Sequence, residues 1–111
     1  MNDNGTLSIE RVWTEGADVL TLRGDLDLTS VGSLISALDA TEATKVILEL
    51  NAVTFIDSAG MRAVDQARRQ LAGGRRLLIV AGSDSPAAWA FRVAGYEENL
   101  IVPSLDEAIQ S

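Results

Sequence analysis

The chain has 111 residues, of which 47% are hydrophobic and 23% charged, so it is long enough to bury one core and too apolar to be disordered. A net charge of −7 argues against a nucleic-acid partner, and the absence of Cys and His excludes disulfides, zinc knuckles and thiol catalysis. No apolar run approaches the roughly 18 residues of a membrane span, and the polar start MNDNGT is unlike a secretory signal, so we expect a cytoplasmic protein.

The first quarter of the chain predicts a β-hairpin. Residues 6–13 and 19–23 are short runs of β-prone residues, and the segment TEGAD separates them. Gly16 and Asp18 in this segment suit a tight turn. The two strands should therefore pair antiparallel.

The next segment, LDLTSVGSLISALDA, predicts a first helix. Its apolar residues recur at the i, i+3, i+4, i+7 spacing of one helix face, and they are Val31, Leu34, Ile35 and Leu38. Thr29 or Ser30 is available to cap the start of this helix. The four apolar side chains are therefore expected to face the core.

The rest of the chain alternates buried strands with helices. The runs VILEL (46–50) and LLIVA (77–81) are nearly all apolar, as expected of strands covered on both faces in a parallel sheet. One helix should begin at Asp57 and stop before the pair Gly73 and Gly74, and another should run from Ser85 to Gly95. Residues 100–102 look extended, and a capping-box pattern opens a last short helix.

This order of elements predicts a single small α/β domain over residues 1–111. The sheet should be mixed but mostly parallel, with four to five strands, an N-terminal antiparallel hairpin and about four helices. In such a sheet, the loops that follow the parallel strands gather at one edge. The segments GDLDLTS and FIDSAG both belong to this set, so we expect the working surface there.

The junction FIDSAG places an acid and a hydroxyl residue at the start of a helix. Asp57 is suited to cap the unpaired amide groups of the first turn, and Ser58 would be the first helical residue, with its hydroxyl facing solvent. Taken alone, this pattern favours an ordinary helix start over a functional site, since caps of this kind are common.

Several pieces of the chain together resemble the anti-sigma-factor antagonists of the STAS domain family. They are the GDLD turn (24–27), the VILEL strand, the FIDSAG junction and the paired glycines before LLIVA. The resemblance implies a STAS domain over the whole chain that binds an anti-sigma factor with serine kinase activity and so frees a sigma factor. It also implies that Ser58 accepts the phosphate and that a phosphatase removes it. The partner kinase would supply the nucleotide and Mg²⁺, and the chain itself, a monomer or weak dimer, would carry no cofactor.

The partner-binding surface expected from this resemblance combines the acidic turn with the helix start; its residues are Asp25, Asp27, Asp57, Ser58, Ala59, Gly60 and Met61. The two turn acids would meet a basic group on the kinase, or would simply form a turn and a helix cap. Gly60 permits close approach of a partner or close packing of the helix on a strand. Met61 is an interface anchor or a core residue.

Phosphorylation of Ser58 would act on this surface through charge. It adds about 1.5 to 2 negative charges beside acids that already make the edge negative. Burying an unpaired charge in an interface costs several kcal/mol, and each ~1.4 kcal/mol changes affinity about tenfold. The modified chain should therefore lose its partner without refolding.

Two other classes of function compete with this interpretation. A serine hydrolase needs a base beside its nucleophile, but the chain has no GxSxG motif and no His, and Lys45 is expected at the far end of the sheet from Ser58, so we predict no enzyme. A STAS module of a membrane lipid transporter or of a stress-sensing assembly shares the fold. Ala59, where many family members carry a second hydroxyl residue, leaves the choice between a simple switch and a larger assembly open.

Overall fold

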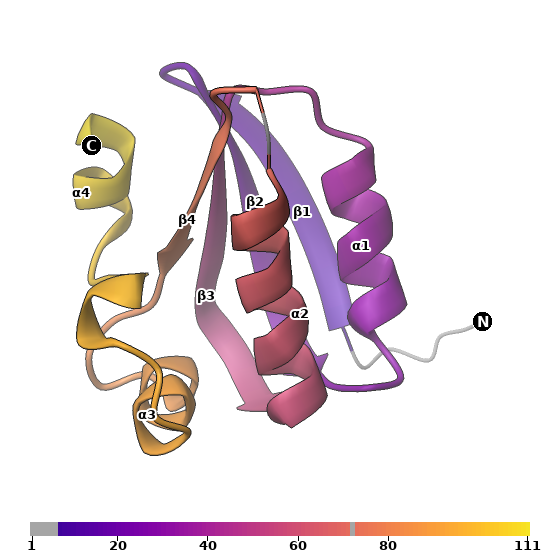
Figure 1. Ribbon diagram of the computed structural model, residues 1–111, viewed down its shortest axis with the longest axis vertical. Helices are drawn as coiled ribbons and strands as arrows, with labels where there is room; N and C mark the ends of the chain where they lie inside the picture. Colours follow the sequence, from indigo (N-terminus) through magenta and orange to yellow (C-terminus); the bar gives the residue numbers. More distant parts are fainter. Residues whose placement is uncertain (1–6, 72) are drawn as a thin grey trace.

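The computed structural model describes residues 7–71 and 73–111, and it contains one five-stranded sheet. The strands lie in the order β1-β2-β3-β4-β5, in which β1 is antiparallel to β2 and every other neighbouring pair is parallel (Figure 1). This arrangement confirms the predicted α/β fold and its N-terminal hairpin. None of the helices in the described ranges has the length and apolar character that crossing a membrane requires.

The strands differ greatly in length; they are β1 (Leu7–Thr14), β2 (Ala17–Leu26), β3 (Lys45–Ile56), β4 (Arg76–Val80) and β5 (Ile101–Val102). The hairpin turn between β1 and β2 places Glu15 and Gly16 at positive φ. The central strand β3 has 12 residues, whereas β5 has two and leaves part of the β4 edge uncovered.

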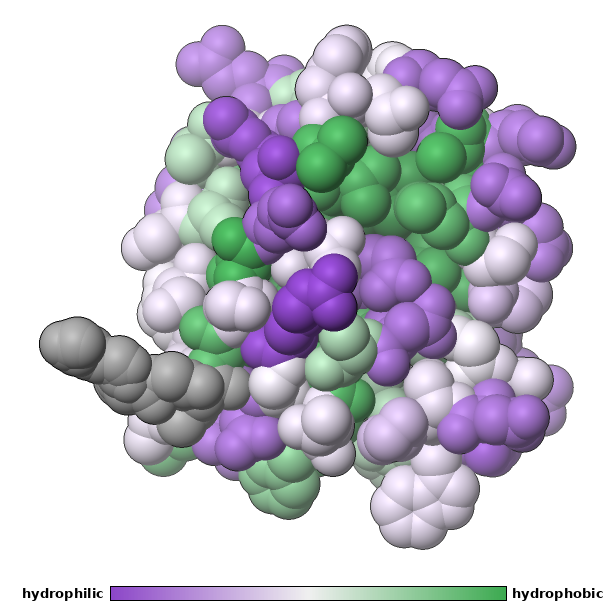
Figure 2. Space-filling view, turned by 180° about the vertical axis from the view of Figure 1, so that it is seen from behind, coloured by the Kyte–Doolittle hydropathy of each residue, from purple (hydrophilic) through white to green (hydrophobic). Residues whose placement is uncertain are grey.

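Helices cover the two faces of the sheet unequally; they are α1 (Val31–Asp39), α2 (Ser58–Gln70), α3 (Pro86–Val93) and α4 (Leu105–Gln110), with a 3₁₀ turn at Glu98–Leu100. The main core lies under α1, α2 and α3, while α4 closes a second, smaller core on the opposite face. In Figure 1, α1 and α2 lie in front of the strands. From behind, one hydrophobic patch is surrounded by hydrophilic side chains (Figure 2).

The main core follows from the alternation of side chains along the central strands. Leu20 and Leu22 of β2 and Leu48 and Leu50 of β3 are fully buried on the same face of the sheet. Successive strand residues point to opposite faces, so this i, i+2 spacing aims all four at α1, α2 and α3. Ile47 points the other way and packs in the smaller core with Ala108 of α4.

Two local predictions were wrong. The segment 24–26, predicted as part of a turn, belongs to β2, because Gly24 and Asp25 pair with β3 through an irregular register. The turn therefore begins only at Asp27. Ile35, predicted to face the core, is 51% exposed, because α1 has a single fully buried residue, Leu34, against the sheet.

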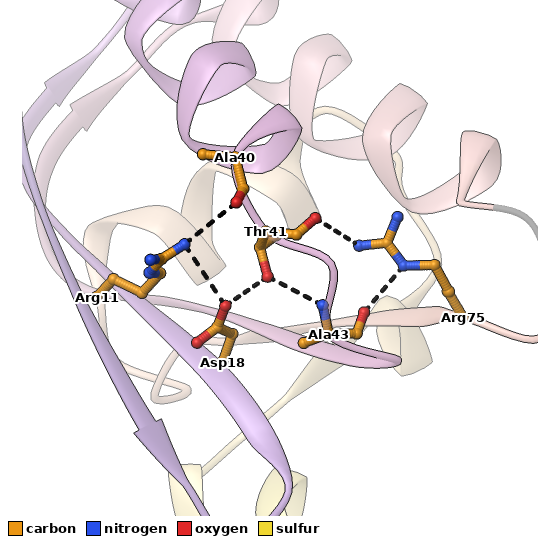
Figure 3. Close-up of polar contacts among 6 residues, drawn as sticks. All are labelled: Arg11, Asp18, Ala40, Thr41, Ala43 and Arg75. Carbon is orange, nitrogen blue, oxygen red and sulfur yellow. Dashed lines mark hydrogen bonds and ion pairs between the residues drawn. The ribbon is translucent and has the colours of Figure 1, made fainter.

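A polar network joins three connections at the end of the sheet where the parallel strands begin (Figure 3). The hydroxyl of Thr41 donates to the buried carboxylate of Asp18, and Arg11 lies 3.8 Å from the same carboxylate. Arg75 donates to the carbonyls of Ala43 at 2.9 Å and Thr41 at 3.0 Å. The network fixes the hairpin, the α1–β3 connection and the α2–β4 connection to one another.

Candidate functional site

The start of α2 is built around Asp57, as the sequence predicts. Asp57 has an extended backbone and caps the helix, since its carboxylate accepts a hydrogen bond from the Gly60 amide at 2.8 Å. The same carboxylate accepts from the Leu28 amide at 3.4 Å, and the Asp57 amide donates to the Leu26 carbonyl at 3.3 Å. Asp57 therefore holds the β2–α1 connection against the first turn of α2.

Ser58 is the first residue of α2, and it is exposed. The first four amides of a helix have no carbonyl partner within the helix, and the helix dipole places partial positive charge there. A group added to the Ser58 oxygen would project from this position into solvent. The site is thus open to chemical modification.

The two residues after Ala59 face inward. A β-carbon on residue 60 would lie 2.3 Å from the Leu26 carbonyl oxygen, so glycine is required there for the helix to pack on the end of β2. Met61 is 8% exposed and packs in the main core. Gly60 and Met61 therefore have the packing roles that the sequence allows for them. Ala59 is partly exposed. The partner contacts expected of these three residues stay predictions.

Asp27 forms a compact turn just before α1. Its carboxylate accepts from the Thr29 hydroxyl at 2.7 Å and from the Thr29 amide at 3.0 Å. These hydrogen bonds, above all the one from the Thr29 hydroxyl, hold the pKa of Asp27 below its usual range, because they favour the charged form. Ser30 occupies the predicted cap position, but its hydroxyl donates to the Asp25 carbonyl at 2.9 Å instead of capping the helix.

Asp25 lies two residues before Asp27, within strand β2. It is the register partner of Phe55 on β3, and its carboxylate accepts from the Thr54 hydroxyl at 3.2 Å. The structure therefore brings Asp25, Asp27 and Asp57 to one edge of the sheet, each held by a separate set of donors. In the described ranges, no three side chains of the kinds that bind metals form a cluster.

Comparison with known families identifies the fold. A family model described as the STAS domain matches residues 8–108. The chain belongs to the STAS domain family. Among the curated proteins, none matches this chain.

Solved structures with a similar fold include two anti-sigma factor antagonists and a sulfate transporter family protein. An anti-sigma factor antagonist from Mycobacterium paratuberculosis has a TM-score of 0.82 at 18% identity, covering 99% of this chain and 97% of that one. The anti-sigma factor antagonist SpoIIAA in its unphosphorylated form has a TM-score of 0.64 at 21% identity, covering 93% and 94%. A sulfate transporter family protein from Wolinella succinogenes has a TM-score of 0.65 at 21% identity, covering 89% and 86%. At these identities the likeness establishes the fold.

The part of the sheet that carries Asp25, Asp27 and Asp57 also carries two exposed apolar side chains that sequence reasoning missed. Leu28 is 72% exposed and Phe55 is 52% exposed, and both adjoin the acids through the contacts given above. Large apolar groups surrounded by charge are typical of protein interfaces. The signal for Leu28 in the sequence is its place directly between an acid and a hydroxyl residue, in DLT, and that pattern is common; Phe55, between Thr54 and Ile56, carries no such signal.

Proposed function

We propose that this STAS protein is an anti-sigma-factor antagonist of the cytoplasm. Its unphosphorylated form binds an anti-sigma factor that is also a serine kinase, and phosphorylation of Ser58 abolishes that binding, thereby regulating transcription that depends on a sigma factor. The protein binds and does not catalyse. The observation that carries the proposal is an exposed serine in the first turn of α2, at an edge that presents three carboxylates and two apolar side chains.

The surface suits a partner with an apolar pocket and a basic rim. Leu28 and Phe55 would enter the pocket, while Asp25, Asp27 and Asp57 would meet the rim. Complementary charge of this kind speeds association and fixes the orientation of the partners. Ser58 would lie within the contact as a small neutral group.

A phosphate on Ser58 would change the balance at once. It would add about 1.5 to 2 negative charges to an edge that already carries three carboxylates, and the partner would have to bury that charge or withdraw. The free amides of the first turn of α2 can accommodate an anion, so the modified chain keeps its fold. One of the structural neighbours, SpoIIAA, is described in both an unphosphorylated and a phosphorylated form, which supports a switch of this type.

A second candidate function is that of a STAS module in a larger assembly, such as a membrane transporter or a stress sensor. The likeness to the sulfate transporter family protein favours it. The two candidates differ in the partner recovered: a kinase in the first case and a transporter or assembly subunit in the second.

The decisive experiment is capture of partners from the native cell extract, with mass spectrometry of both the partner and the phosphorylated residue. The unmodified chain and Ser58→Ala should recover the kinase. Ser58→Asp should bind it about a hundredfold or more less tightly, as an uncompensated buried charge implies. Ser36→Asp adds the same charge on the exposed side of α1 and should bind normally. Phosphate on a different residue, or full binding by Ser58→Asp, would contradict the proposal.

A further inference from the structure

Strand β1 forms an open edge of the sheet. It is the first strand in the sheet order, and the described residues form no backbone hydrogen bonds with its outer side. Edge strands of soluble proteins are usually short, bulged or rich in charge, which prevents a further strand from pairing with them. The other edge strand, β5, has only two residues. β1 has eight residues in a regular register with β2, and its only charged residues are Glu10 and Arg11, which are of opposite sign.

The hairpin turn determines which backbone groups of β1 are free. Both residues of the turn have positive φ, as in a two-residue type I′ turn. In such a hairpin the residues on either side of the turn, here Thr14 and Ala17, form a hydrogen-bonded pair. Hydrogen-bonded and non-hydrogen-bonded pairs then alternate along the two strands. The amides and carbonyls of Ile9, Arg11 and Trp13 therefore point away from β2, toward the open edge.

Two large apolar side chains are exposed on β1, one on each face of the sheet. Val12 is 49% exposed and lies opposite Val19, which belongs to the smaller core. Trp13 is 64% exposed and, as the next residue along the strand, points to the face that α1 covers. An unpaired edge with apolar side chains on both faces is suited to pair with another chain.

A hollow of about 450 Å³ lies between β1 and α1, beside this edge. Among the residues that line it are Ile9 and Arg11 of β1 and Ala37 and Ala40 of α1. The guanidinium of Arg11 is directed toward α1 by its hydrogen bond to the Ala40 carbonyl at 3.4 Å (Figure 3). The small side chains of α1 leave space here for a large side chain from a strand added to β1.

We propose that β1 pairs antiparallel with β1 of a second copy of this chain, about a two-fold axis at Val12. The added strand would bond to the free amides and carbonyls, so that Arg11 of each copy exchanges two backbone hydrogen bonds with Trp13 of the other. The two Val12 side chains would meet on one face of the sheet. On the other face, Trp13 of the second copy would lie beside Arg11 and next to the hollow.

Charge and exposure select this register. The free backbone groups require residues of the same face to lie opposite each other, so the axis passes through a residue of β1. An axis at Glu10 or Arg11 would place two like charges opposite each other, which is unfavourable. An axis at Ile9 would place Val12 and Trp13 beyond the second strand. With the axis at Val12, both exposed side chains are covered, and the indole of Trp13 faces a guanidinium, which it attracts.

This dimer would leave the surface around Ser58 free, because that surface lies on elements other than β1. The axis is perpendicular to the sheet, so the two copies run in opposite directions and their Ser58 residues face opposite ways. Only about five residues of each strand pair, so the contact is smaller than a standard interface. We therefore expect a weak dimer that forms near about 100 µM.

The first test is sedimentation velocity of the chain from about 10 µM to about 1 mM, the range that a contact of this size calls for. Val12→Lys places two like charges on the axis and should raise the dissociation constant about tenfold or more. Val93→Lys adds the same charge at an apolar residue of α3 that is 64% exposed, and it should dimerise normally.

A mixture of variants tests the position of the axis. Val12→Glu alone should also fail to dimerise, but an equimolar mixture of Val12→Lys and Val12→Glu should associate. Only a residue on the axis faces its own counterpart, so this rescue is specific to the register proposed. It also shows that both variants are folded.

Cross-linking provides an independent test, because the chain has no Cys of its own. In the proposed dimer the two Val12 residues form a non-hydrogen-bonded pair, with Cα atoms about 4.5 Å apart, which suits a disulfide. In a buffer of oxidised and reduced glutathione, Val12→Cys should therefore form a disulfide-linked dimer. Glu10→Cys places its thiols about 14 Å apart and should cross-link at least about tenfold less.

Four results would overturn the proposal. They are a chain that stays monomeric up to about 1 mM, normal dimerisation of Val12→Lys, no association in the mixture, and equal cross-linking of the two cysteine variants. None of these results bears on Ser58, and loss of kinase binding by Ser58→Asp does not bear on β1. The failure of one proposal is therefore distinguishable from the failure of the other.

Discussion

Gly60 lies so close to Leu26 that a β-carbon on residue 60 would be 2.3 Å from the Leu26 carbonyl oxygen. The obstacle is backbone, which cannot rotate away as a side chain can. We therefore expect Gly60→Ala to lower the free energy of unfolding by about 1–3 kcal/mol through overpacking. Urea denaturation followed by circular dichroism measures this change.

Gly32→Ala is the matched control for that variant. Gly32 lies in α1, and a β-carbon there would meet nothing within 4 Å. Alanine is the better helix former, so this variant should be as stable as the unchanged chain or up to about 1 kcal/mol more stable. Equal unfolding midpoints for the two variants would show that the Leu26 contact imposes no constraint.

The pKa of Asp27 should depend on the Thr29 hydroxyl. In the folded chain, hydrogen bonds, chiefly from that hydroxyl, lower the pKa of Asp27 from its ordinary value of 3.8. A folded-state pKa below the unfolded one stabilises the fold above the unfolded value, and this contribution is lost as the pH falls through the folded value. Thr29→Val should raise the Asp27 pKa, whereas Thr29→Ser should preserve it, as ¹³C NMR of the carboxyl carbon will report.

The same pair of variants gives a stability test. The difference in unfolding free energy between the unchanged chain and Thr29→Val should be largest near neutral pH. It should shrink below pH 3.8, as Asp27 becomes protonated in both proteins. A difference that grows in acid would contradict the assigned hydrogen bond.

Phe55 should be an anchor for the proposed partner. It is 52% exposed beside Asp25, so removing its ring changes the docking surface with little loss from the core. We expect Phe55→Ala to weaken binding of the captured kinase about tenfold or more, as truncation of a central aromatic residue does. Isothermal titration calorimetry measures this affinity. In that assay Ile35→Ala, at a residue 51% exposed on α1, should leave binding unchanged.

Thr41 should contribute to stability through the buried carboxylate of Asp18. Its hydroxyl donates to Asp18 and accepts from the Ala43 amide at 3.2 Å, so Thr41→Val leaves one buried and one partly buried polar group without this partner. The expected loss of unfolding free energy is about 1–3 kcal/mol. Thr54→Val removes an exposed hydroxyl bonded to Asp25 and should change stability by less than about 0.5 kcal/mol. Similar losses for the two variants would contradict a special role for Thr41.

The order of the elements and the cap at Asp57 could be predicted from the sequence, because both depend on local patterns. Apolar runs and their spacing identify the strands and helices, and the cap joins Asp57 to an amide only three residues further along the chain. The exposure of Ser58 follows from the side of α2 on which it lies, since Gly60 and Met61 of the same turn are buried. Each of these features is decided within a few residues of chain.

The features that could not be predicted depend on contacts between distant segments. Gly24 and Asp25 favour a turn by composition, and Gly24 has a φ of 103°, yet both pair with β3 through an irregular register. Ile35 has the spacing of a core residue, but it lies on a part of α1 that the sheet does not reach. The network around Asp18 joins residues 23 to 34 positions apart, and no local pattern announces it.

The length of β3 separates the polar network around Asp18 from Ser58. Eleven residue steps of about 3.3 Å each separate Lys45 from Ile56, a path of about 36 Å along the strand. Mobile ions in the cell screen charges over about 8 Å, so a dianion at one end is electrostatically invisible at the other. Any communication between the Asp18 network and the serine of α2 would have to pass mechanically along the strand that joins them.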